Sequence, residues 1–243
     1  MPDEREVANA NLNKALHSIL KGSLNRNGFT KRTNRTYMRI TDGDLLQSIG
    51  IQKHSWQTTF TINIFVYQLY QGQLDEHLTA IITVRQGSLY TAAYRKDKSI
   101  EELDHWFDFG DLEKTTRSVE TLRSELEMFI FPFLDAVSSN MQLAEFVFER
   151  TVDQTPDFIQ SSATWSNYLA GMLALRLEDP DHAIYFLNQS IKNAGKIEYA
   201  WGKKLRKEAM SLKELFEKDE EQLNMYFQKN IANNMERIKL KQS

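Results

Sequence analysis

The chain of 243 residues contains no cysteine. This absence excludes disulfide bonds, cysteine-ligated zinc and a cysteine nucleophile, and it fits a protein from a reducing compartment. Glycine is scarce, with 10 residues in the chain. These glycines do not cluster, so no glycine-rich phosphate loop is present. The five histidines are scattered singly, and no HExxH or GxSxG motif occurs. We therefore predict no cofactor and no metal ion, and no residue stands out as catalytic.

Long hydrophobic runs are also missing. No apolar stretch reaches the roughly 20 residues that a membrane helix needs, and the first six residues are too polar and acidic for a secretory signal. The net charge of −3 and the pI of about 6.0 argue against general polyanion binding by the whole chain. The sequence predicts a cytoplasmic protein without a membrane partner.

What the chain does contain is hydrophobic periodicity, which changes near its middle. Residues 5–21 carry one apolar stripe with helical spacing. The period then becomes two, with a strand predicted at 29–40, a turn at Asp42-Gly43 and the clearest strand at 60–67. Three further strand-like segments lie at 45–52, 78–84 and 105–109. Short connections favour an antiparallel arrangement, so we predict a sheet of four to five strands.

From residue 112 onward the pattern is helical. Pro132 is expected to kink or divide the first long helix, because proline lacks the backbone donor. Thr155-Pro156-Asp157 interrupts the pattern and predicts a boundary. Four helices are expected beyond that boundary, at 165–177, 181–194, 196–218 and 220–240. We predict an α+β fold in which residues 1–150 form a sheet packed on helices, and residues 157–243 form an all-helical C-terminal subdomain.

The first half resembles a domain-of-unknown-function family, DUF4304, over residues 7–137. The residues that carry this resemblance follow one another in the family's order: Gly28-Phe29-Thr30-Lys31-Arg32, Tyr37-Met38-Arg39, Ile49-Gly50-Ile51-Gln52-Lys53, Trp56, Phe60-Thr61-Ile62-Asn63, Val84-Arg85-Gln86-Gly87-Ser88-Leu89 and Trp106-Phe107. The chain departs from the family at Phe65-Val66, where a glycine is usual. The resemblance implies a fold and no established reaction, although some members look like bacterial accessory or immunity-type proteins.

The helical hairpin after residue 163 is similar to a single tetratricopeptide unit. Aromatic, small and Ala-Ile residues fall at the positions that this repeat uses, namely Tyr168, Gly171, Asp181, Ala183, Ile184 and Ser190. Repeat arrays usually need about three units for stability, and only one is found here. The alternative is a helical hairpin that packs on the sheet domain.

Charge is unevenly distributed along the first half. Six cations occur between residues 21 and 39 without an acid, and an acid-rich segment follows at 97–113. A basic strand face that includes Arg35 and Arg39 can bind an acidic protein partner or nucleic acid. Alternatively, the basic and acidic segments face each other or are simply solvated.

Polar and aromatic residues also gather around the second predicted hairpin. Alternation places Gln52 and His54 on one side of their strand, with Trp56 and Asn63 nearby in sequence. Such a cluster can form a pocket for a small ligand or peptide. It can equally reflect cross-strand hydrogen bonds on a half-exposed face.

These patterns favour a non-enzymatic module that binds another protein, in an immunity-type or regulatory role in a bacterium. The alternatives are an enzyme or small-ligand binder that uses the polar and aromatic face, and, with weaker support, nucleic-acid binding through the basic strand. The oligomeric state stays open. The candidate binding residues are Arg35, Arg39, Gln52, His54, Trp56, Asn63 and Trp106.

Overall fold

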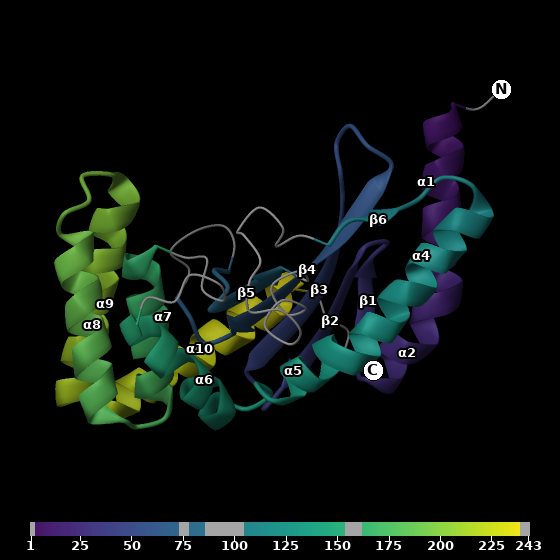
Figure 1. Cartoon of the computed structure of the whole chain (residues 1–243). Coiled ribbons are helices and arrows are strands. Elements are labelled where there is room, and N and C mark those ends of the chain that lie inside the picture. The colour runs from purple at the N-terminus through teal and green to yellow at the C-terminus, as the bar shows by residue number, and fades with distance from the viewer. Residues whose placement is uncertain (1–2, 73–77, 86–104, 154–161, 239–243) are drawn as a thin grey trace. The chain divides into compact units, whose positions relative to one another are not determined.

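A computed structural model describes residues 3–72, 78–85, 105–153 and 162–238 (Figure 1). The chain forms two compact units, and each combines segments that are distant in sequence. Unit 1 comprises Met1–Arg39, Gln47–Phe65 and Val84–Ala136, and unit 2 comprises Ile40–Leu46, Val66–Thr83 and Val137–Ser243. The predicted boundary at 155–157 lies outside the described residues. The predicted α+β class is confirmed, with an antiparallel sheet and a helical C-terminal region.

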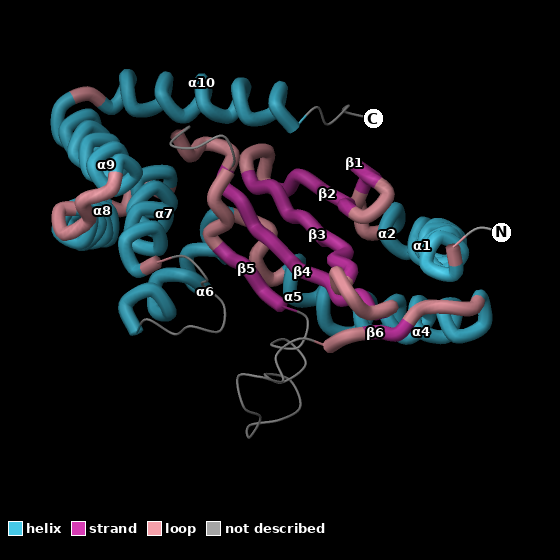
Figure 2. The backbone as a smooth tube through the Cα atoms, turned by 90° about the horizontal axis from the view of Figure 1, so that it is seen from above, coloured by secondary structure: helices cyan, strands magenta, loops and turns pink. Residues whose placement is uncertain are grey.

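The sheet has six strands, and five of them are neighbours in chain order (Figure 2). These five are β1 (Thr30–Thr33), β2 (Thr36–Thr41), β3 (Leu45–Lys53), β4 (Thr59–Gln68) and β5 (Ile82–Arg85). The short β6 (Phe107–Asp108) pairs antiparallel with β4. The strands predicted at 78–84 and 105–109 correspond to β5 and β6, although both are shorter than predicted.

The prediction of one strand at 29–40 is wrong, because this segment folds back on itself. Asn34 and Arg35 form a tight turn, and β1 pairs antiparallel with β2 so that Lys31 lies opposite Tyr37. Asparagine is a common turn former, so Asn34 favours a turn here. The alternation of residues on both sides of Asn34 favoured one continuous strand instead. The predicted Asp42-Gly43 turn is confirmed. Its two residues have φ of 52° and 75°, the left-handed pair that joins strands tightly.

Two helical segments form the apolar core of unit 1. The first runs through α1 (Glu4–Ala15), a π-helical turn at Leu16–Leu20 and α2 (Lys21–Arg26). The second runs through α4 (Leu112–Glu125), a π-helical turn at Leu126–Ile130 and α5 (Phe131–Asp135). Helices α1 and α4 pack against each other. The buried core side chains include Leu12, Leu16, Leu20, Leu24, Val119, Leu122, Leu126, Ile130, Ile49, Ile51, Phe60, Ile62 and Ile64.

Proline and glycine explain how these helical segments end and continue. The N–H of Phe131 bonds to the carbonyl of Leu126, five residues earlier, so the chain enters α5 through a wide turn just before Pro132. The first segment ends at Gly28, which has φ of 77°. The N–H of Phe29 bonds to Leu24 O at 2.9 Å and that of Gly28 to Asn25 O at 3.0 Å, a left-handed helix end that glycine favours.

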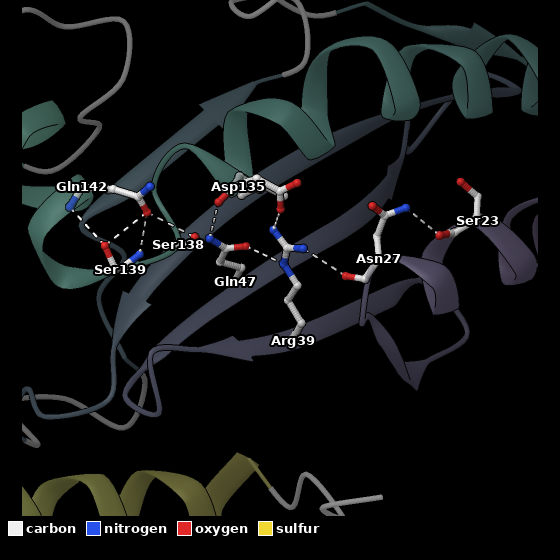
Figure 3. Close-up of polar contacts among 9 residues, drawn as sticks. Ser23, Asn27, Arg39, Gln47, Asp135, Ser138, Ser139 and Gln142 are labelled. Atoms are coloured by element: carbon white, nitrogen blue, oxygen red, sulfur yellow. Dashed lines mark hydrogen bonds and ion pairs between the residues drawn. The ribbon is translucent and has the colours of Figure 1, made fainter.

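One arginine of the sheet binds the ends of both helical segments (Figure 3). Arg39 donates from Nη1 to Asn27 O at 3.0 Å and from Nη2 to Asp135 Oδ1 at 2.6 Å. Its Nε donates to Gln47 Oε1 at 2.7 Å, and the Nε2 of Gln47 donates to Leu134 O at 2.7 Å. The guanidinium also lies 4.8 Å from the ring centre of Phe29. The last carbonyls of a helix lack intrahelical hydrogen-bond donors. Arg39 supplies a donor to Asn27 O, and Gln47 supplies one to Leu134 O.

Unit 2 contains five helices in its described part: α6 (Asn140–Asp153), α7 (Ala163–Arg176), α8 (Pro180–Ala194), α9 (Ala200–Lys218) and α10 (Glu220–Ile238). The predicted hairpin forms α7 and α8. A Cβ added to Gly171 would lie 2.9 Å from the Leu187 side chain, so a small residue is needed there. The likeness to a tetratricopeptide unit stays a prediction. In the described residues we find no helix long and apolar enough to cross a membrane.

A polar network anchors the β2–β3 turn within unit 2. Asp42 Oδ2 accepts from the backbone N–H of Asn140 at 3.0 Å, at the start of α6. Asp44 is buried and accepts from Asn140 Nδ2 at 2.7 Å and from Arg176 Nε at 2.8 Å. The hydroxyl of Tyr70 donates to Asn140 Oδ1 at 2.9 Å. Each buried polar group named here therefore has a partner, as a stable interior requires.

We expect Arg39→Met to lower the free energy of unfolding by about 2–4 kcal/mol, because it leaves the Asn27 carbonyl, the Asp135 carboxylate and Gln47 Oε1 without this donor. Arg39→Lys should recover only part of this loss, since an ammonium cannot reach three acceptors in a fork. Chemical denaturation measures both. The control is Arg26→Met, whose exposed side chain lies 3.5 Å from Glu127 and should change the value by less than about 0.5 kcal/mol. Equal effects at both positions would contradict this role.

Two left-handed acidic residues should respond in opposite directions to glycine. Glu178 ends α7 with φ of 56° and an exposed side chain, so Glu178→Gly should stabilise the protein by about 0.5–1 kcal/mol. Asp42 has φ of 52°, but its carboxylate holds Asn140, so Asp42→Gly should destabilise it by about 1 kcal/mol. Thermal denaturation checks the signs, and a stabilising Asp42→Gly would refute the anchoring role.

Candidate functional site

The candidate site lies in unit 1, where β3 ends, the chain turns and β4 begins. Alternate β4 residues Phe60, Ile62 and Ile64 are fully buried, which turns Asn63 toward the opposite face of the sheet. On that face Asn63 Nδ2 donates to Gln52 Oε1 at 2.6 Å. The structure therefore brings these two predicted site residues together across β3 and β4, with Gln52 exposed and Asn63 half-buried.

His54 shapes the turn that follows β3. Its Nδ1 accepts hydrogen bonds from the backbone N–H groups of Trp56 at 3.2 Å and Gln57 at 3.1 Å. The backbone N–H of His54 donates to Thr59 O at 2.9 Å. Because Nδ1 is an acceptor here, the neutral ring carries its proton on Nε2. The imidazole thus acts as a cap that holds residues 54–59 in a compact turn.

Trp106 adds an aromatic wall beside this turn. Phe60 lies opposite Phe107 in the β4–β6 pair, and their rings stack with centres 5.3 Å apart. Trp106 precedes Phe107 and therefore points to the other face, where its ring meets that of His54 edge-on at 5.3 Å. Four of the predicted residues, Gln52, His54, Asn63 and Trp106, consequently lie on one face of the sheet.

Trp56 projects from the same turn into solvent. Its exposed fraction is 89%, the largest of any large hydrophobic residue in the described part of the chain. A tryptophan side chain can bury about 150–250 Å² against another surface. Leaving that area in water forgoes several kcal/mol of hydrophobic stabilisation, at about 25 cal/mol per Å². Packing against the described residues does not explain the position of Trp56, whereas the Trp106 ring contacts His54.

Three cations stand beside the turn. The guanidinium of Arg5 donates to Ser55 O, and Lys53 Nζ donates to Asn9 Oδ1. Partial burial, together with the nearby charges of Arg35 and Arg5, lowers the pKa of Lys53 from its ordinary value. Within the described residues, no carboxylate pairs with Arg5, Arg35 or Lys53. The turn is therefore flanked by positive charge that the described part of the chain does not neutralise.

The remaining predicted residues are separated by the fold. Arg35 lies in the β1–β2 turn, close enough to Lys53 to act on its pKa, and its backbone O accepts from Ile51 N at 2.8 Å. Arg39 instead binds Asn27, Gln47 and Asp135, and only 11% of its side chain is exposed. The basic run at 21–39 thus does not form one continuous face, since Arg26 is paired with Glu127.

Sequence reasoning missed Arg5, Asn9 and Lys53 as members of this site. Arg5 donates to a residue 50 positions away, and Asn9 meets a residue 44 positions away. Such contacts leave no local signal in hydrophobic periodicity. Alternation places Lys53 on the side of β3 opposite to Gln52, so the strand pattern gave no reason to group it with the predicted site residues.

Comparison with protein families gives a match in the first half of the chain. Residues 20–136 match the family model described as Domain of unknown function (DUF4304). Comparisons with curated proteins and with solved structures gave no match. The matched segment begins within the first helical segment and ends just after α5, so it includes the sheet and the β3–β4 turn. Residues 20–136 are therefore similar to a DUF4304 domain, which confirms the resemblance that the sequence carries.

Proposed function

We propose that this protein is a non-enzymatic binding module that recognises another protein through the β3–β4 turn of unit 1. The binding surface consists of Trp56 with Arg5, Arg35 and Lys53, and we name it the turn surface. The observation that carries the proposal is a tryptophan with 89% of its surface exposed, beside cations that no described carboxylate neutralises. The partner should present an acidic segment with an apolar pocket for the indole.

The aromatic part of this surface fits the anatomy of protein interfaces. Binding energy in such interfaces concentrates in a few residues, among which tryptophan and arginine are enriched. Trp56 extends from a turn that His54 holds through two backbone hydrogen bonds. A side chain presented on a fixed turn loses less conformational freedom on binding than one on a free loop.

The charged part of the surface sets the chemistry of the partner. Partial burial lowers the pKa of Lys53, and the positive charges of Arg35 and Arg5 lower it further. A carboxylate from a partner would offset these positive charges and would steer the approach of the two proteins. An acidic segment of a partner would therefore supply the carboxylates that the described residues of the chain do not place beside these three cations.

A protein fits this surface better than nucleic acid. Nucleic-acid sites usually form long basic stripes on domains with a pI above about 9. Here the pI is about 6.0, and Arg39 and Arg26 of the basic run are already paired with Asp135 and Glu127. The cluster at the turn is compact, which suits a few carboxylates rather than a polyphosphate chain.

The finer form of the proposal is an immunity-type or regulatory protein in a bacterial cytoplasm. The similarity of the first half to DUF4304, some members of which look like bacterial accessory or immunity-type proteins, supports it. A chain without a recognisable catalytic set, whose exposed tryptophan and cations lie in one place, is suited to hold one cognate protein.

Trp56→Ala should abolish partner capture. The protein, tagged and expressed in its source cells, is purified at moderate salt, and the co-purifying proteins are identified by mass spectrometry. We expect one near-stoichiometric acidic protein, whose affinity for Trp56→Ala falls at least tenfold when the purified pair is titrated calorimetrically. The matched control is Tyr199→Ala, an aromatic that is 74% exposed on unit 2, which should bind like the wild type. Equal affinity of both variants for the partner would refute the turn surface.

Lys53→Glu should separate stability from binding. The new carboxylate can pair with Arg5 and Arg35, so we expect the Tm to rise by about 1–3 °C. The same change places a negative charge in front of an acidic partner and should abolish capture. Differential scanning calorimetry and the capture experiment are run on the same preparation. A lower Tm would show that Lys53 serves the fold, and retained capture would remove the electrostatic part of the proposal.

A further inference from the structure

Unit 2 carries a groove that is independent of the turn surface. It runs between α8 and α9, and its apolar floor includes Ile191 and Met210. Half of the Met210 side chain is exposed, at 51%. The sequence reasoning treated 196–218 only as a helix, although charged and apolar residues alternate there with helical spacing. An exposed methionine in a charged groove is a feature of adaptable binding surfaces.

The charges along the groove are graded. At the end nearer the start of α9 lie Lys203, Arg206 and Lys207, all exposed. No carboxylate in the described part of the chain pairs with them. At the other end the charges are balanced, because Lys213 lies 3.9 Å from Glu217 and Lys218 lies 2.7 Å from Glu214. The groove thus has a cationic half and a neutralised half along one apolar floor.

We propose that this groove binds an acidic amphipathic helix of a partner protein. Residues 203, 207, 210 and 214 recur at the spacing of one helix face, so they present a straight strip along α9. A helix laid along α8 and α9 would place its apolar stripe on Ile191 and Met210 and its acids beside Lys203, Arg206 and Lys207. From Lys203 to Lys218 the strip rises about 22 Å, the length of a helix of roughly 15 residues.

The same observations disfavour a nucleic acid in this groove. Glu214 and Glu217 line one half and would repel phosphates, while the apolar floor offers no aromatic ring on which bases could stack. An acidic amphipathic helix fits both halves of the groove. Its acids pair with the cationic half, and its apolar stripe packs along the floor of both halves. The groove lies wholly on unit 2, so this inference does not depend on the turn surface.

The test uses a synthetic helical peptide of about 15 residues, built from Glu, Leu and Ala with Glu and Leu on opposite faces. Its binding to the full chain is measured by fluorescence anisotropy, beside a scrambled peptide of the same composition and a single-stranded oligo-dT. We expect the amphipathic peptide to bind, and the scrambled peptide and the oligo-dT to bind at least tenfold more weakly. Failure of the amphipathic peptide to bind, or tighter binding of oligo-dT, overturns the proposal.

Two triple variants test the location of the site. K203E/R206E/K207E reverses the cationic half and should weaken peptide binding at least tenfold. K14E/K21E/K229E reverses three exposed lysines outside the groove, gives the same net charge and should bind like the wild type. Met210→Asp places a charge in the apolar floor and should weaken peptide binding, although it changes the net charge of the protein by only one unit. Equal losses in the two triple variants would mean that only the overall charge acts, which would overturn the groove.

Discussion

The fold of unit 1 depends on a cation held inside it. The guanidinium of Arg39 reaches Asn27 at the end of α2, Asp135 at the end of α5 and Gln47 in the neighbouring strand. Both helical segments end there with carbonyls that need donors, and a sheet strand supplies them. A charge with so little exposed surface is tolerated only because its donors are used. Three of its five N–H donors are used in this network, and 11% of its side chain is exposed, so Arg39 serves the fold, whereas Arg35 of the same basic run lies beside Lys53.

The difference between Arg39 and Arg35 shows which features the sequence could predict and which it could not. Local patterns identified the helices, the Asp42-Gly43 turn and the strand β4, because hydrophobic period and turn residues act over a few positions. They could not separate Arg39 from Arg35, although both lie in the same basic run. The partner of Arg39 is 96 residues away, and the neighbours of Arg35 include Lys53 of another strand. Likewise the alternation at 29–40 hid a turn, because β1 and β2 share a pattern that a single strand would also show.

The side chains around the β3–β4 turn fall into two groups, those that hold the turn and its sheet face together and those whose apolar area or charge the described residues do not compensate. Gln52 and Asn63 bind each other, and His54 binds the turn, so these polar side chains mainly keep the shape of the site. Trp56 and the cations Arg5, Arg35 and Lys53 are the groups whose exposed apolar area and charge the described chain leaves uncompensated. Residues retained at a cost to stability are the natural carriers of function, since packing alone would not select them.

The β2–β3 hairpin links the two units in a way that constrains any change to it. It contributes Arg39 to the helix-end network of unit 1, and only three and five positions later it contributes Asp42 and Asp44 to the network of unit 2. A substitution of Arg39 therefore removes contacts within unit 1, and a substitution of Asp42 or Asp44 removes contacts within unit 2. The α8–α9 groove lies wholly within unit 2, and the turn surface lies within unit 1, where Lys53 ends β3 and Arg35 precedes β2. Substitution of Trp56 or of the groove cations therefore leaves the contacts of both polar networks intact, so the residues proposed to bind a partner are separate from those that hold the fold.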